Sequence, residues 1–229
     1  MKRFPKSCLT VGLSWTLLTV SIQSAFPQHH GLKSDPAITI RVYNFAQVSA
    51  RSLIEAEKQA TSIFQEVGIN PLWVDCPLTH EESSNYPQCQ QATGLMDFHL
   101  RILSQQMAER YGKRFTTFGF SVPCPDDGRG CVSNVFLHRV EELAKRTGAT
   151  LPGLMGHVMA HEIGHLLLGL TEHGPTGIMR AYWNREDLRR AALGHLVFTQ
   201  DEANAIRNRV TRRAERQEAN QATKVVVTE

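Results

Sequence analysis

The chain has 229 residues, of which 41% are hydrophobic and 21% are charged, and its formal net charge at pH 7 is +3. A chain of this length can form one domain with a substantial core. So small a net charge gives no reason to expect binding to nucleic acid or to an anionic membrane.

The first 25 residues have the organisation of a secretory signal peptide. Three basic residues among the first six precede an apolar stretch from Cys8 to Val20, and small residues follow at Ser24 and Ala25. A membrane anchor is the alternative reading. It is disfavoured because that stretch is shorter than the ~20 residues that span a bilayer. Removal of residues 1–25 leaves 22 basic and 22 acidic residues. We therefore expect a secreted or otherwise extracytoplasmic protein without stable membrane insertion.

The next part of the chain predicts strands and one helix. Ile38 to Phe45 alternates between apolar and polar residues as a strand does, and Val48 to Val67 has helical periodicity. Ile69 to Val74 and Met96 to Leu103 predict further strands. These patterns predict an α+β fold, with a mixed twisted sheet, in one domain that covers residues 36–210.

Four cysteines remain after signal removal, at Cys76, Cys89, Cys124 and Cys131. An even number in an exported chain favours two disulfides over free thiols. Three pairings are possible. Cys76 with Cys89 and Cys124 with Cys131 each close a loop that contains proline or glycine, and we expect these pairs. A second metal site is the alternative, which the absence of a C-x-x-C pair disfavours.

Two segments on either side of the second cysteine pair, 115–122 and 132–137, predict a hairpin just before a strongly apolar helix. Thr150 and Pro152 provide a polar cap and an early proline, so this helix is expected from about Pro152 to Leu168. It contains the pentapeptide His161-Glu162-Ile163-Gly164-His165 in an otherwise almost wholly apolar run. Three buried polar side chains are costly unless something pairs with them, which indicates a metal site.

The helical spacing places His161 and His165 on one face, about 6 Å apart along the axis, so both can bind one ion. Neutral imidazole suits zinc, and a catalytic zinc has three protein ligands and a water whose pKa falls to about 7. Gly169 can end the helix and let the chain return His173 as the third ligand. Glu162 can accept the proton of that water. His157 is about 12 Å of helix rise from His165, too far to bind the same ion.

These residues resemble the metzincin clan of zinc endopeptidases, especially its matrixin-like members, which join an H-E-x-x-H helix, a glycine turn, a third histidine and a Met-turn. In that family the glycine and third histidine follow the second histidine by three and six residues. Here Gly169 and His173 follow His165 by four and eight. The motif is therefore a lengthened H-E-x-x-H-x-x-x-G-x-x-x-H.

The resemblance implies a single zincin-like catalytic domain, a peptide or protein substrate, and hydrolysis of peptide bonds with one Zn²⁺ ion. It implies that Met179 is the Met-turn residue beneath the metal, for which an ordinary core methionine is the alternative. It also implies that the predicted hairpin lines the cleft and binds an extended peptide by strand addition. A plain structural hairpin is the alternative there.

Two other functions stay open at this point. In a gluzincin-type peptidase an acidic residue on a later helix supplies the third ligand, and Glu202, 37 residues after His165, is a candidate. A secreted zinc-binding module could instead recognise a protein partner without hydrolysis. Glu162 argues against the module, because a structural zinc site usually has four protein ligands and no use for a carboxylate beside an open position.

The last predicted element is a C-terminal helix. Thr199-Gln200-Asp201-Glu202 has the pattern of a capping box, which starts a helix that runs through Arg209 or beyond. The arginines of this helix are expected to form a solvated face. Residues 217–229 are expected to form a mobile end of the chain.

Overall fold

The computed structural model describes residues 36–113, 117–122, 124, 128–169 and 173–227. The predicted signal peptide lies outside the described residues, as do the first residues of the predicted hairpin and residues 170–172 of the motif. Among the helices of the described part, none combines the length and the apolar character needed to cross a membrane.

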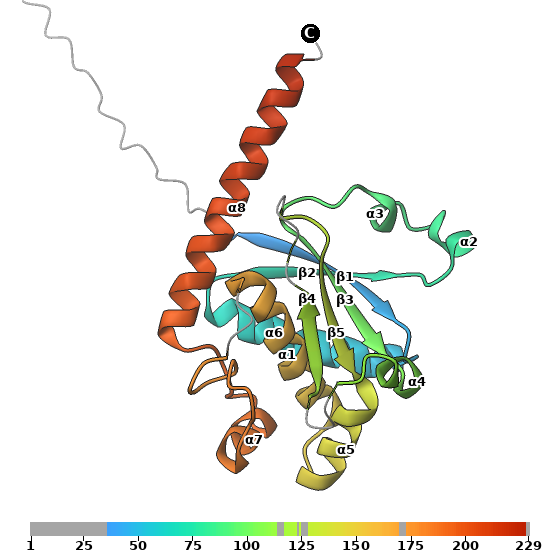
Figure 1. Cartoon of the computed structure of the whole chain (residues 1–229), viewed down its shortest axis with the longest axis vertical. Coiled ribbons are helices and arrows are strands. Elements are labelled where there is room, and N and C mark those ends of the chain that lie inside the picture. Colours follow the sequence, from blue (N-terminus) through green and yellow to red (C-terminus); the bar gives the residue numbers. More distant parts are fainter. Residues whose placement is uncertain (1–35, 114–116, 123, 125–127, 170–172, 228–229) are drawn as a thin grey trace, which may run out of the picture. The chain divides into compact units, whose positions relative to one another are not determined.

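A five-stranded mixed sheet forms the centre of the fold (Figure 1). Its strand order is β2 (Asn70–Cys76), β1 (Ala37–Asn44), β3 (Asp97–Leu103), β5 (Cys131–Phe136) and β4 (Gly119–Val122). The first four strands are mutually parallel, and β4 pairs antiparallel with β5 at the sheet edge. The predicted hairpin is thus confirmed for the residues that the structure describes.

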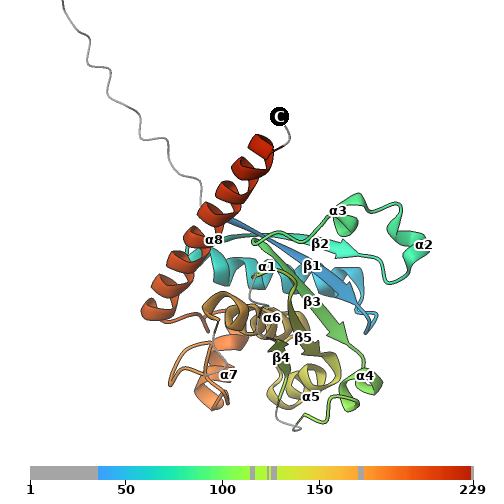
Figure 2. The same ribbon diagram turned by 45° about the horizontal axis from the view of Figure 1, so that its top comes forward.

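Two long helices, α1 (Ala50–Glu66) and α6 (Leu151–Leu168), pack against each other and against the sheet. Every second residue from Ile38 to Val42 and from Phe98 to Ile102 is buried, as expected for strands with one face on a core, and Arg41 and Leu103 on the opposite face are buried as well. Helix α8 (Gln200–Val227) packs on α6, as Figures 1 and 2 show. The core residues contributed by the two central strands are Ile38, Ile40, Val42, Phe98, Leu100 and Ile102.

Several helices were not assigned from the sequence. Helix α5 (Leu137–Thr147) directly continues β5, and α7 (Arg185–Ala192) follows the predicted Met-turn region. Three helices of four or five residues complete the fold. They are α2 (His80–Ser83), α3 (Pro87–Gln90) and α4 (Gln105–Glu109).

Helix α6 begins and ends as its sequence predicts. The Thr150 side chain accepts a hydrogen bond from the Gly153 backbone N–H at the first turn. At the other end Gly169 has a φ of 62° and closes the helix by donating its N–H to the His165 carbonyl. The local sequence therefore fixes both ends of the helix that bears His161 and His165.

The start of α8 is also confirmed, whereas its end differs from the prediction. Thr199 and Glu202 exchange the two hydrogen bonds of a capping box. The helix continues to Val227, although the sequence predicted a mobile end from Gln217. Tertiary contact explains part of the difference, because the Gln217 side chain accepts hydrogen bonds from the backbone N–H groups of Leu95 and Met96.

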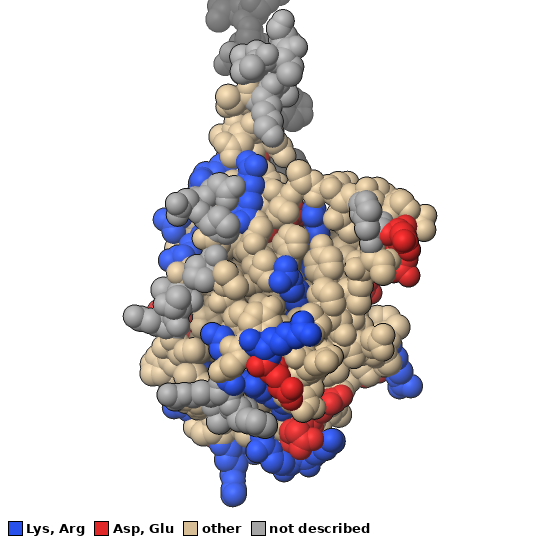
Figure 3. All heavy atoms as spheres, turned by 45° about the vertical axis from the view of Figure 1, so that its right-hand side comes forward, with Lys and Arg blue, Asp and Glu red and all other residues tan. Residues whose placement is uncertain are grey.

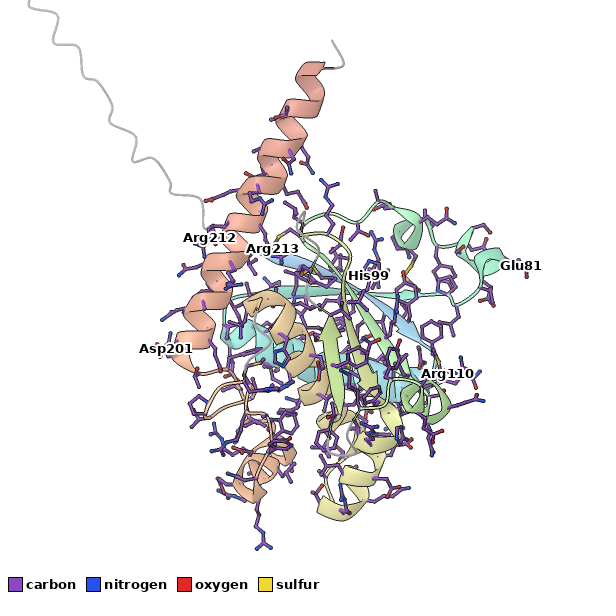
Figure 4. The ribbon with its side chains drawn as sticks, viewed as in Figure 1. Glu81, His99, Arg110, Asp201, Arg212 and Arg213 are labelled. Atoms are coloured by element: carbon purple, nitrogen blue, oxygen red, sulfur yellow. A yellow bond between two sulfur atoms is a disulfide. The ribbon has the colours of Figure 1, made fainter. Side chains whose placement is uncertain are left out.

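The two expected disulfides, Cys76 with Cys89 and Cys124 with Cys131, are both present. Charged side chains of both signs are interspersed over the face shown in Figure 3. In Figure 4, Arg212 and Arg213 lie on different sides of α8. Arg213 bonds inward, to the carbonyls of Leu95 and Gly128, so the arginine-rich helix is not solvated on every side.

Candidate metal centre

Three histidines from two segments converge at the C-terminal half of α6. One ring nitrogen from each of His161, His165 and His173 lies within 4.8 Å of the others. The Nε2 atoms of His161 and His165 are 3.1 Å apart. Nitrogens that bind one tetrahedral zinc at ~2.05 Å lie about 3.3 Å from each other, so His161 and His165 have the spacing of two zinc ligands and the third nitrogen lies close to them.

The orientation of the His161 ring is fixed by a hydrogen bond at its Nδ1 atom. Its Nδ1 lies 2.7 Å from the carbonyl oxygen of Ile178, and the same oxygen accepts the indole N–H of Trp183 at 3.0 Å. A carbonyl only accepts, so Nδ1 must carry the proton. Nε2 therefore presents its lone pair toward the other two histidines, as a metal ligand requires.

The protonation states also suit metal binding. Burial, and next the neighbouring His165, lowers the pKa of His161 to about 3. Burial lowers the pKa of His173 as well, although His173 is exposed on one side. Both rings are therefore neutral near pH 7, and only neutral imidazole has a free lone pair for a cation.

Glu162 is almost fully buried beside the histidines, at 4% exposure. Its Oε2 lies 2.9 Å from the Ser121 hydroxyl, which belongs to the edge strand β4. Burial raises the pKa of Glu162 to about 8, and the Ser121 hydrogen bond acts in the opposite direction. A divalent cation beside it would also favour the charged carboxylate. Glu162 is thus placed to exchange a proton near neutral pH.

Two serines bind the backbone at the same point. The hydroxyls of Ser121 and Ser133 lie 2.6 and 2.9 Å from the Glu162 carbonyl oxygen and 2.9 Å from each other. Ser121 and Ser133 are direct partners in the β4–β5 ladder. The sheet edge and the helix are therefore joined by two hydroxyls at the Glu162 backbone carbonyl.

The close approach of β4 to α6 requires a glycine. A Cβ atom on Gly119 would lie 2.6 Å from Glu162 Oε1 and 2.7 Å from its Cγ, and it would also collide with the Asn134 carbonyl oxygen. No side chain larger than hydrogen fits there without moving Glu162.

Met179 is buried against α6 and is 1% exposed. A Cβ atom on Gly164, between the two histidines of α6, would lie 2.8 Å from the Met179 sulfur. The Met179 carbonyl accepts the N–H of Gly174, the residue after His173. The 174–180 turn thus ties the third histidine to the floor of the site.

A cleft of about 710 Å³ opens over this cluster. Its walls include all four residues of β4, the residues after Met179 up to Trp183, and the three histidines with Glu162. This volume is within the range of ordinary ligand sites.

The remaining sequence candidates are placed elsewhere. Glu202 caps α8 through its bond to the Thr199 N–H and is not part of the histidine group, so the structure favours His173 over Glu202 as the third donor. His157 is fully buried, with Nδ1 2.7 Å from the Gly153 carbonyl. Its Nε2 has no hydrogen-bond partner among the described residues.

Four residues of the site were not found from the sequence: Ser121, Ser133, Gly119 and Trp183. Their contacts with α6 join positions that lie far apart in the chain, which no local pattern reveals. The one signal in the sequence that pointed to these residues was the expectation that a hairpin borders α6.

Comparison with known proteins gives little further information. No protein-family model matches the sequence, and no curated protein matches it. One solved structure that is similar is metalloproteinase-II from Bacteroides fragilis, at a TM-score of 0.40 and 10% sequence identity. The match covers 76% of this chain and 53% of that one, so the chain spans about half the length of that structure.

Proposed function

We propose that this chain is a secreted zinc-dependent endopeptidase. The observation that supports it most directly is the convergence of three histidine nitrogens beside the buried Glu162, at the base of an open cleft. His161, His165 and His173 are the proposed zinc ligands, with Met179 as the Met-turn residue beneath them.

A zinc ion bound there would supply Lewis-acid polarisation of a peptide carbonyl and would lower the pKa of a coordinated water to about 7. Glu162 would act as general base and then as general acid, accepting a proton at its carboxylate and returning it to the leaving amine. Ser121 orients that carboxylate through its bond to Oε2. The Ile178 carbonyl holds His161 in the required tautomer.

The substrate would bind along β4. This strand is the edge of the sheet, and its four residues line the cleft. One side of the β4 backbone is paired with β5. An extended peptide can add to the other side by main-chain hydrogen bonds, which would lay a peptide bond across the histidine cluster.

The geometry favours a catalytic over a structural role for the metal. Structural zinc sites usually have four protein ligands, whereas the described residues provide a group of three histidines facing a cleft. A buried carboxylate beside such an open position has no evident structural purpose, because its burial costs free energy.

The test compares the wild-type protein with Glu162→Gln, both loaded with zinc and quantified by elemental analysis. We expect one zinc per chain in both proteins and a loss of peptide hydrolysis of about 100-fold or more in the variant. Peptides of mixed sequence serve as substrate, and cleavage is followed by mass spectrometry. A wild type that binds zinc and cleaves no peptide would support the non-hydrolytic zinc module instead.

Export is a separate part of the proposal. It is supported by the two disulfides, which persist in oxidising compartments. We expect the exported protein to begin near residue 26, which intact-mass measurement of the purified product can check. A product that retains residues 1–25 would favour a membrane anchor.

A further inference from the structure

The walls of the cleft have an unequal distribution of charge. Among the described residues that line it, the cationic side chains apart from the histidines are Lys113, Arg180 and Arg213. Glu162 is the sole aspartate or glutamate in the same described lining. Its carboxylate accepts a hydrogen bond from the Ser121 hydroxyl. The site is therefore electropositive before any metal binds.

The three cations do not have the same role. Arg213 is largely buried, and it donates to the carbonyls of Leu95 and Gly128 and to the Cys124 sulfur. These bonds hold the disulfide loop against α8, which makes Arg213 a structural residue. The Lys113 ammonium lies 5.1 Å from the centre of the Phe120 ring, toward the start of the edge strand.

Arg180 is placed next to the metal centre. It follows Met179 directly, and its backbone forms an isolated bridge with Gly174, the neighbour of His173. One side of its guanidinium is held by Asp187, with Nη1 2.9 Å from Oδ2. The Arg180 side chain is 33% exposed, compared with 8% for Asp187. Arg180 is among the residues that line the cleft, whereas Asp187 is not.

Asp187 is itself held firmly. It is the third residue of α7 and forms a capping box with Asn184, so its Oδ2 also accepts the Asn184 backbone N–H at 3.0 Å. Asp187 thus fixes the Arg180 side chain before a ligand arrives. The described structure gives the remaining N–H groups of this guanidinium no other hydrogen bond. A planar guanidinium held in this way is suited to bind a carboxylate at low entropic cost.

We propose that Arg180 selects peptides with an aspartate or glutamate side chain close to the scissile bond. This inference rests on the proposed peptidase function and names its substrate class. The acidic side chain binds the exposed edge of the guanidinium, while the peptide lies along β4. Lysine or arginine at the same substrate position is repelled. Asp187 acts as a positioning residue, because it acts through Arg180.

The first test digests a peptide library of randomised sequence with the zinc-loaded wild type and maps the cleavage sites by mass spectrometry. We expect enrichment of aspartate and glutamate at one position near the cleaved bond. Arg180→Gln should lose that enrichment. Arg189→Gln is the matched control, because Arg189 pairs with Glu186 on the exposed side of α7 and is absent from the cleft lining. It should retain the enrichment.

The preferred peptide is then compared with its glutamine counterpart. A charge-assisted hydrogen bond predicts that kcat/KM is about tenfold higher for the acidic peptide. Most of the difference should lie in KM, because Arg180 does not touch the reacting atoms. Cleavage without acidic enrichment would overturn the selectivity and leave the proposed function intact. No cleavage of any peptide would overturn both.

A binding measurement separates recognition from hydrolysis and uses an unaltered Arg180. Zinc-loaded Glu162→Gln is titrated calorimetrically with three alanine-rich peptides that differ only in carrying glutamate, glutamine or lysine. The glutamate peptide should bind about tenfold more tightly than the glutamine peptide, and the lysine peptide most weakly. Equal binding of the three would overturn the inference. Arg180→Lys keeps the charge and provides a second variant for the case in which Arg180→Gln fails to fold. It should retain part of the preference for the glutamate peptide.

Discussion

The Nδ1 atom of His161 lies 2.7 Å from the carbonyl oxygen of Ile178, which precedes the buried Met179. This contact joins α6 to the turn that follows the third histidine. The contact keeps the proton on Nδ1, so that the lone pair of Nε2 can bind a cation. Because Trp183 donates to the same oxygen, the carbonyl is held on two sides.

The histidine cluster predicts which substitutions remove zinc. Loss of a hydrogen-bond partner of a metal ligand weakens metal binding by ~10–100-fold. His173→Ala should weaken zinc binding by more than this, because it removes one of the three donors. His195→Ala is the control, since His195 is exposed and lies outside the cluster. Zinc content after dialysis against a competing chelator measures the difference. Equal zinc in the two variants would exclude His173 as a ligand.

Ser121 should affect catalysis without affecting metal content. Ser121→Ala removes the hydroxyl that bonds Glu162 Oε2, so the carboxylate loses its orientation. We expect kcat to fall about fivefold to tenfold, the equivalent of one hydrogen bond, at unchanged zinc stoichiometry. Ser133→Ala is the matched control, because Ser133 bonds the Glu162 backbone carbonyl and not its carboxylate. The two variants should differ in kcat, and an equal fall would refute the assignment.

Gly119→Ala tests the close contact between β4 and α6. The added methyl group would meet the Glu162 side chain and the Asn134 backbone, which cannot retreat without opening the β4–β5 pair. Overpacking of this kind costs about 1–3 kcal/mol of unfolding free energy. We expect a lower thermal midpoint and a loss of hydrolysis, with His161 and His165 still able to bind zinc. Wild-type activity at an unchanged midpoint would contradict this packing.

Glu57 should make stability depend on pH. Burial, followed by the charge and hydrogen bond of Asp75, raises the pKa of Glu57 from 4.5 to about 7. Between these values the folded chain binds more protons at this site than the unfolded chain. Stability should therefore fall as the pH rises from about 4.5 to about 7, and this contribution should level off above that range.

The measurement is the thermal midpoint of unfolding across pH 4.5 to 8 for the wild type and Glu57→Gln. The variant should lose part of the decline, because its amide does not ionise. Glu55→Gln serves as control on the same helix, where Glu55 is exposed and pairs with Arg51. An unchanged pH profile in Glu57→Gln would show that another group is responsible.

The parts of the structure that were predicted from the sequence are those set by local patterns. The spacing of His161 and His165, the glycine at position 169 and the Thr199 capping box each act within a few residues. The disulfides were predicted from short loops. The sequence also indicated the first strand, because its residues alternate between apolar and polar.

The parts that were missed depend on tertiary contacts. Ser121 reaches Glu162 only because β4 lies against α6, and Arg180 reaches Asp187 only after the chain turns into α7. The last turns of α8 were expected to be a mobile end. Their sequence is polar and has few apolar anchors, and the bonds from Leu95 and Met96 to Gln217 arise from a segment over 120 residues earlier.

The disulfide between Cys124 and Cys131 joins the wall of the cleft to the first residue of β5. Arg213 donates to the sulfur of Cys124, so the bridge also meets α8. In a reducing cytosol the two thiols would leave this wall without its covalent connection. Assembly of the complete cleft would then be linked to oxidative folding. In the proposed secreted peptidase, the wall of the cleft would be completed only after export, which would limit cleavage of proteins in the cell that makes it.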